Sequence, residues 1–188
     1  MMKSVLLNPF SSLKKGLLLA LLIFSGYLSA AEPMSLSRYE LGSGDKINIS
    51  VYGEEDMDKQ LILSDAGTVS YPFLGEFKAK GLTVGQLEQM ITKRLKQGYF
   101  IDPRVSVGIV EYRKFFVSGE VKSPGGFQFE PGLTLEKAVA LAGGFTQRAS
   151  KRGITVTREE NGQPKERELS LNDSVFPGDI IVISESFF

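Results

Sequence analysis

The sequence from residue 42 to residue 51 reads Gly-Ser-Gly-Asp-Lys-Ile-Asn-Ile-Ser-Val. Its first four residues tolerate a left-handed backbone, so we expect them to form a turn. The apolar residues Ile47, Ile49 and Val51 then alternate with polar residues. This period of two predicts a half-buried β-strand that begins at Lys46.

Further strands are predicted where short apolar runs lie between turn residues. The stretch Gly-Asp-Ile-Ile-Val-Ile-Ser at 178–184 repeats the turn and strand pattern of residues 44–50. Pro72 interrupts one apolar run, and that strand must break there or lie at an edge, because proline cannot donate a hydrogen bond to a neighbouring strand. Asn161-Gly162 is typical of a hairpin turn. The predicted strands cover residues 46–51, 69–74, 105–109, 115–117, 154–157, 166–171 and 180–183.

Two helices are predicted from their capping residues. Thr83 and Gln86 have the spacing of a capping box, and Gly98 ends the helix that follows. Three basic residues in its last turn are better explained by compensation of the helix dipole than by an anionic partner. A shorter helix begins after Thr134 and stops at Gly143-Gly144. The apolar face of the first helix consists of Val84, Leu87, Ile91 and Leu95.

These elements place the chain in the α+β class, as two small mixed parts, each with several strands and one helix. The chain has 188 residues, of which 42% are hydrophobic and 23% are charged, as in a globular protein. It contains no His, Cys or Trp. This excludes Ser-His-Asp and Cys-His nucleophiles, zinc sites built on His or Cys, and disulfides. Carboxylates, Lys, Ser, Thr and Tyr remain for chemistry, so an enzyme is disfavoured, and the sequence singles out no catalytic, cofactor-binding or metal-binding residue.

The first 31 residues are predicted to be a cleaved signal peptide. Three lysines without an acid precede an apolar run at 17–28, and small residues at 29–31 precede Glu32. The run is shorter than the roughly 20 residues that a membrane anchor needs. Without the signal, 19 basic residues face 22 acidic ones. That balance argues against nucleic-acid binding, which needs a basic face.

Two groups of residues leave alternative interpretations open. The acidic residues at 54–58 lack the residue order of a calcium loop, and a plain surface loop is favoured over a cation site. Phe115-Phe116 and Phe187-Phe188 are candidates for stacking on a sugar or for a subunit interface. Core packing of the first pair and a frayed end for the second are equally compatible with the sequence.

The order of the motifs resembles the bacterial polysaccharide export family, the Wza-like outer-membrane export proteins. The first part of the chain, residues 32–112, is similar to the family's N-terminal export domain. The second part, residues 113–188, is similar to a single soluble-ligand-binding β-grasp domain. The blocks that carry the resemblance are Tyr39 to Glu54, Ser64 to Gly75, Gly81 to Thr83, Asp102 to Val107, and Val117 to Gly144 with the closing Pro177 to Val182.

The resemblance implies a non-enzymatic, ring-forming subunit that guides an exopolysaccharide or a capsular polysaccharide through the periplasm and outer membrane. It also implies an inner-membrane copolymerase as a partner. The sequence has neither the acylated Cys nor the C-terminal amphipathic helix of the large members. We therefore expect an exported protein that carries no lipid, has no spanning segment and docks beneath a separate outer-membrane pore protein. Strand edges near Pro72 and Phe115-Phe116 are the expected contacts between subunits.

Two other classes of function are compatible with the residues. One is a monomeric periplasmic module that binds a sugar or another small molecule, and the oligomeric state distinguishes it from a ring subunit. The other is a polysaccharide hydrolase or lyase that uses carboxylates, because a catalytic pair need only be close in space. The absence of Trp and His makes this enzyme the weakest of the three hypotheses.

Overall fold

A computed structural model describes residues 38–160 and 162–186 of the chain. The predicted signal peptide and the Phe187-Phe188 pair lie outside these residues. Ten strands and two α-helices are present in the described ranges, which confirms the α+β class. We refer to residues 38–112 as the N-terminal region and to residues 113–186 as the C-terminal region.

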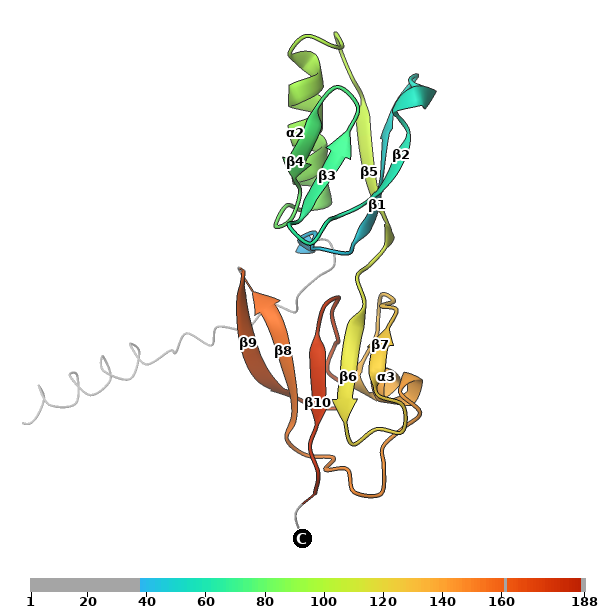
Figure 1. The fold of residues 1–188 in the computed structure, drawn as a ribbon, viewed down its shortest axis with the longest axis vertical. Helices are drawn as coiled ribbons and strands as arrows, with labels where there is room; N and C mark the ends of the chain where they lie inside the picture. Colours follow the sequence, from blue (N-terminus) through green and yellow to red (C-terminus); the bar gives the residue numbers. More distant parts are fainter. Residues whose placement is uncertain (1–37, 161, 187–188) are drawn as a thin grey trace, which may run out of the picture. The chain divides into compact units, whose positions relative to one another are not determined.

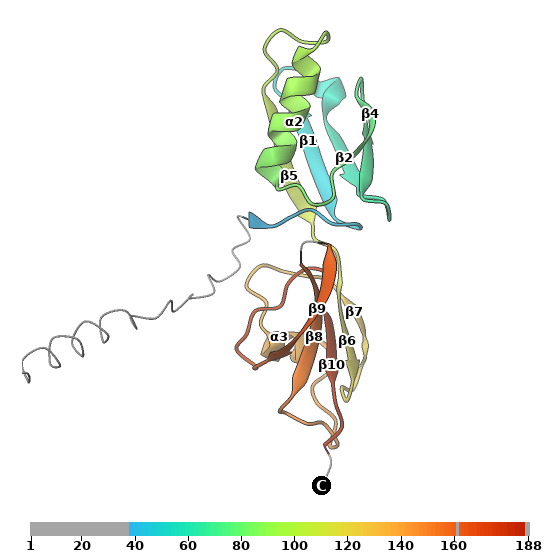
Figure 2. The ribbon, with the colours of Figure 1, turned by 90° about the vertical axis from the view of Figure 1, so that its left-hand side faces the viewer.

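The N-terminal region contains a three-stranded antiparallel sheet in the order β2-β1-β5, and helix α2 covers one face of it (Figure 2). A separate two-stranded hairpin, β3-β4, lies beside the helix (Figure 1). The elements are β1 (Lys46–Val51), the 3-10 helix η2 (Glu55–Met57), β2 (Lys59–Ile62), β3 (Thr68–Tyr71), β4 (Gly75–Lys78), α2 (Val84–Lys96) and β5 (Val105–Glu111).

Local signals in the sequence account for most of these boundaries. The capping box of α2 is present: the Thr83 side chain accepts a hydrogen bond from the backbone N–H of Gln86, whose own side chain accepts one from the N–H of Thr83. Strand β3 ends at Tyr71, immediately before Pro72, as the missing proline donor predicts. Phe73 and Gly75 complete that turn with φ values of 63° and 65°.

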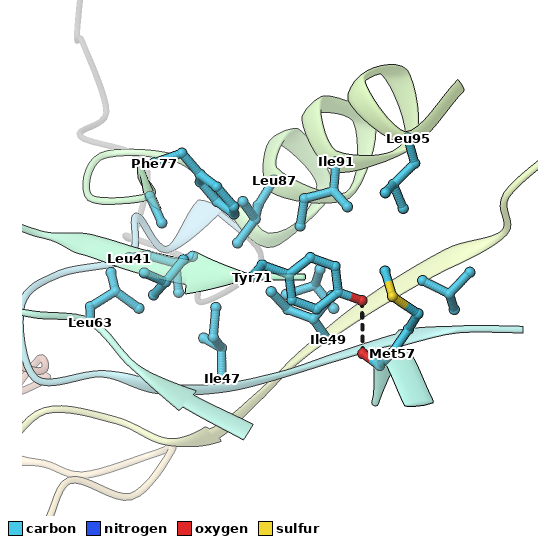
Figure 3. Close-up of a cluster of buried hydrophobic side chains, with 14 of the residues drawn as sticks. Leu41, Ile47, Ile49, Met57, Leu63, Tyr71, Phe77, Leu87, Ile91 and Leu95 are labelled. Atoms are coloured by element: carbon cyan, nitrogen blue, oxygen red, sulfur yellow. Dashed lines mark hydrogen bonds between the residues drawn. The ribbon is translucent and has the colours of Figure 1, made fainter. Parts of the chain in front are cut away.

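The core of the N-terminal region lies between the sheet, the hairpin and α2 (Figure 3). Tyr71 is only 2% exposed, and its hydroxyl donates to the Met57 carbonyl at 2.8 Å. Burial raises the pKa of Tyr71 to about 12, and the charge of Asp58 adds to the effect. Within the predicted loop, residues 55–57 form one turn of 3-10 helix, and Met57 is buried in the core.

The C-terminal region is a five-stranded mixed sheet in the order β7-β6-β10-β8-β9 (Figure 1). Strand β10 is parallel to β6, and the other neighbours are antiparallel. Helix α3 buries Leu135, Ala138 and Val139 against the sheet and is capped by Thr134. The elements are β6 (Phe115–Gly119), β7 (Gly125–Phe127), α3 (Leu135–Leu141), β8 (Ile154–Glu160), β9 (Gln163–Leu169) and β10 (Ile180–Ile183).

The β8-β9 hairpin is longer than the sequence predicts, and its second strand begins three residues earlier. The two strands pair without a break up to Glu160 and Gln163. Strand β9 is charged and almost wholly exposed, so it has no apolar alternation to mark its start. Its pairing is supported by ion pairs of Glu160 with Lys165 and Arg167.

Candidate functional site

Buried charge is concentrated at two turns of the molecule. Among the described residues, the buried charged side chains are Asp45, Arg158 and Asp179. Each aspartate follows a glycine with positive φ, 91° at Gly44 and 86° at Gly178. A buried carboxylate is stable only if donors replace the water that it loses.

The carboxylate of Asp45 gathers donors from three separate parts of the chain. Its Oδ2 accepts from the Tyr39 hydroxyl at 2.6 Å and from the Gly42 N–H at 2.7 Å. Its Oδ1 accepts from the backbone N–H of Arg113 at 2.7 Å, and the Arg113 guanidinium lies 3.4 Å from Oδ2. Burial raises the pKa of Tyr39 well above its usual value, although the charge of Arg113 opposes this shift. Tyr39 is thereby kept as a hydrogen-bond donor.

The carboxylate of Asp179 is held within the C-terminal region. Arg158 donates from Nε to Oδ1 at 2.8 Å and from Nη2 to Oδ2 at 2.7 Å, a bidentate pair. The N–H of Phe176 donates to Oδ2 at 2.8 Å. The Phe176 ring also lies beneath the guanidinium, 4.2 Å from ring centroid to Cζ. This network fastens β8 to the turn that precedes β10.

The segment 111–114, which joins the two regions, contacts both of them. The ring of Tyr112 meets Tyr39 at 5.2 Å and Phe129 at 5.3 Å between centroids, both edge to face. The Gln128 side-chain amide donates to the Tyr112 carbonyl at 2.9 Å. The guanidinium of Arg113 donates to the Tyr39 hydroxyl at 2.7 Å.

Two glycines make room for the Arg113 side chain. A side chain at Gly42 would collide with its Nη1, and a Cβ at Gly178 would lie 2.5 Å from its Nε. Gly42 belongs to the N-terminal region and Gly178 to the C-terminal one. The arginine therefore occupies space that only glycine leaves open on both sides of the joining segment.

An open cleft of about 460 Å³ lies beside this segment. Its volume falls in the range of about 300 to 1,000 Å³ that is typical of small-ligand sites, which often form between domains. Lys80 and Glu159 form an ion pair across it at 2.8 Å. The lining residues are Ser43, Gly44, Lys80, Glu111, Tyr112, Arg113, Lys114, Phe116, Gln128, Glu159 and Gly178.

The structure separates the two members of the Phe115-Phe116 pair. Phe115 is fully buried in the core of the C-terminal region, as core packing predicts. Phe116 is 48% exposed and lines the cleft, so the core interpretation is wrong for this residue. Alternation along β6 explains the difference, because neighbouring residues on a strand face opposite sides of the sheet.

The remaining charged motifs do not form a site. In the described ranges, no three acidic side chains gather closely enough to hold a metal ion, the 54–58 segment included. In the basic last turn of α2, Lys96 pairs with Asp102 at 3.0 Å, and Arg94 lies over the Phe77 ring at 5.4 Å. Within the described ranges, no helix combines the length and apolar character that a membrane span needs.

Comparison with known families matches each region to one family model. Residues 34–110 match the family described as "Polysaccharide biosynthesis/export protein". Residues 114–167 match the SLBB domain. The chain belongs to the polysaccharide export protein family. The resemblance read from the sequence motifs is thus confirmed.

Curated relatives of this chain carry related names. It is 30% identical over 162 residues to the exopolysaccharide production protein ExoF of Rhizobium meliloti, covering 76% of this chain and 38% of ExoF. It is 27% identical over 143 residues to the polysialic acid transport protein KpsD of Escherichia coli, covering 74% and 25%. It is 32% identical over 87 residues to the EPS I polysaccharide export outer membrane protein EpsA of Ralstonia solanacearum, covering 45% and 23%. The chain thus spans well under half the length of each of these relatives.

Sequence reasoning missed the two arginines that pair with the buried aspartates, Arg113 and Arg158. Arg113 follows the end of β5, and Arg158 is a charged residue at an inward position of β8. Their aspartate partners are 68 and 21 residues away along the chain. The repeated Gly-Asp turn is the available signal, because the same turn before two strands places both carboxylates inside. It does not name their partners.

Proposed function

We propose that this protein is a subunit of an export complex that guides an exopolysaccharide or a capsular polysaccharide across the periplasm and outer membrane. The observation that carries the proposal is the succession of the two family matches, at 34–110 and 114–167, in one chain. The relatives named for exopolysaccharide production, polysialic acid transport and EPS I export support the same process. The protein moves the polymer and does not cleave it.

The proposal includes a location and a set of partners. After removal of residues 1–31, the protein works in the periplasm, in association with the outer membrane. It forms a ring of identical subunits, receives polymer from an inner-membrane copolymerase and passes it to a separate outer-membrane pore protein. Distinct surfaces on the two regions favour head-to-tail contacts, and such contacts close into rings when the rotation permits. We also propose that residues 32–112 and 113–188 are separate domains.

Deletion of the gene in the producing strain tests the function. We expect surface polysaccharide to fall strongly while polymer or its precursors accumulate inside the cell. A plasmid copy of the intact gene should restore export, and a copy with an early stop codon should not. Unchanged surface polysaccharide in the deletion strain would refute the proposal.

Protein recovered from the periplasm tests the location and assembly. Intact mass should correspond to a chain that begins at Glu32, and native mass spectrometry should show a closed oligomer when the copolymerase is present. A protein that stays monomeric under every condition would favour a small-molecule binding module. Full-length protein in the inner membrane would make the apolar run at 17–28 an anchor.

A further inference from the structure

The cleft beside residues 111–114 has an aromatic floor. Phe116 lies on the outer face of the C-terminal sheet, opposite the face that buries Phe115 and Val117. Its partner across β10 is Ile180, which is 47% exposed, and its partner across β7 is Gly126. An apolar surface at this position is available to a ligand, because water covers it in the isolated protein.

Gly126 leaves room for the Phe116 ring beside strand β7. A Cβ built at Gly126 would come 2.8 Å from Cε1 of Phe116 and 3.1 Å from its Cδ1. Any larger residue at 126 would push the ring away from the sheet. The ring therefore lies close to the β7 backbone at Gly126, and the Phe116 side chain lines the cleft.

Both hydrogen-bond donors and hydrogen-bond acceptors line the cleft around Phe116. The cations Lys80, Arg113 and Lys114 line the same cleft as the acids Glu111 and Glu159. Asp45 lies directly behind the guanidinium of Arg113, so the charges around the cleft balance. The site lacks the excess of positive charge that a polyanion would need, and its donors and acceptors suit hydroxyl groups.

We propose that this cleft binds the exported glycan, with a neutral sugar ring stacked on Phe116 and its hydroxyls bound by the surrounding polar side chains. A sugar ring has one apolar face of C–H groups and a polar rim, which matches an aromatic floor with polar walls. This inference rests on the proposed export function and adds the place at which the protein touches its cargo.

A second copy of the chain fits the same face less well. The exposed apolar side chains there are Phe116, Ile180 and Val182, and the sheet continues outward through Thr157 to Glu166. A stable protein interface buries about 800 Å² on each partner around an apolar centre that is depleted of charge. The narrow apolar row beside a charged cleft does not offer such a centre.

The experiment titrates short neutral oligosaccharides, prepared by partial hydrolysis of the polysaccharide from the producing cells, into the isotope-labelled protein. We expect the largest NMR shift changes at the Phe116 ring, the Gly126 N–H and the Gln128 side-chain amide. Phe116→Ala should weaken binding about tenfold, and Phe116→Tyr should retain it, because the stacking ring is the feature in question. Gly126→Ala should also weaken binding by displacing the ring.

Val182→Ala is the matched control. It removes an exposed apolar side chain from the same sheet face, paired with Ser118 rather than Phe116. We expect its binding to equal that of the wild type, and unchanged melting temperatures would show that all variants fold. The proposal is overturned if no oligosaccharide binds, if Phe116→Ala binds as tightly as the wild type, or if the shift changes lie elsewhere.

Two further outcomes separate this proposal from others. If Phe116→Ala and Val182→Ala both dissociate an oligomer in native mass spectrometry without changing glycan affinity, the face is a contact between copies and the glycan site is refuted. If the deletion strain still displays polysaccharide, the export function fails. If the deletion strain loses polysaccharide but Phe116→Ala binds normally, only the cleft proposal fails.

Discussion

The two regions bury an aspartate at the same kind of turn but neutralise it differently. Asp179 has a bidentate partner, Arg158, from its own sheet. Asp45 relies on a tyrosine hydroxyl and two backbone N–H groups, with the Arg113 guanidinium farther away at 3.4 Å. One turn motif therefore serves two purposes in this protein. At Asp179 it closes a core, and at Asp45 it attaches the joining segment to the N-terminal region.

The largest effect on stability is expected from breaking the ion pair between Arg158 and Asp179. Arg158→Met leaves the Asp179 carboxylate buried without its bidentate partner, and loss of one member of a buried ion pair costs about 3–5 kcal/mol of unfolding free energy. Urea unfolding followed by region-resolved hydrogen exchange should show the loss in the C-terminal region. The double variant Arg158→Met with Asp179→Leu should recover part of it. Equal stability of the single variant and the wild type would contradict a charged pair in the core.

Alkaline pH should distinguish the regions without any mutation. The sequence places no tyrosine after Tyr112, so only the N-terminal region contains buried phenols. The pKa of Tyr71 is raised from 10.0 to about 12, which means that the fold prefers the protonated form. Its contribution is complete below pH 10 and is lost as the pH rises toward 12, a change of about 2–3 kcal/mol. Burial of Tyr39 acts in the same direction.

Hydrogen exchange at short labelling times across this pH range measures the effect. We expect protection to fall in β1, β3 and α2 while β8 and β10 keep theirs. Tyr71→Phe removes one of the two buried titrating phenols and should reduce the pH dependence of the N-terminal region, leaving the part that Tyr39 contributes. A parallel loss of protection in both regions would mean that they unfold as one body.

Asp45→Asn should have a smaller effect than the loss of Arg158. The amide keeps one acceptor oxygen but presents its NH₂ to donors that faced a carboxylate, and unsatisfied buried groups cost about 1–3 kcal/mol. Because the Arg113 N–H is one of those donors, faster exchange at Arg113 should accompany the loss. A double variant with Tyr39→Phe measures how strongly the two residues are coupled. Additive effects would show that the tyrosine hydroxyl is not an essential donor.

The smallest expected difference concerns the helix caps. Thr83 belongs to a complete capping box, whereas Thr134 accepts from Lys137 at 3.4 Å without a reciprocal bond. Thr83→Ala should cost about 1 kcal/mol of unfolding free energy and Thr134→Ala less. Chemical denaturation of each variant gives the comparison. A larger loss for Thr134→Ala would mean that its backbone contacts outweigh the cap.

The predictable features of this fold were those set by neighbours in sequence. The capping box at Thr83, the break at Pro72 and the alternation of Ile47 and Ile49 each depend on a few adjacent residues, and the structure contains all three. The cleft was not predictable, because Arg113 and Phe116 acquire their roles from contacts with distant chain segments. The short apolar sequence at Phe115-Phe116 did indicate a candidate, but only strand pairing decides which ring is exposed.

The position of strand β10 affects the order in which the two sheets form. The strand lies between β6 and β8, although it is the last strand along the described chain (Figure 1). During synthesis, the edges of β6 and β8 that face β10 therefore stay unpaired until residues 180–183 emerge and pair with them. The N-terminal sheet is complete once residue 111 is available. Long-range pairing of this kind slows folding and leaves strand edges exposed in the meantime. The C-terminal sheet therefore closes only when its last-made strand is available, whereas the N-terminal sheet needs nothing that follows residue 111.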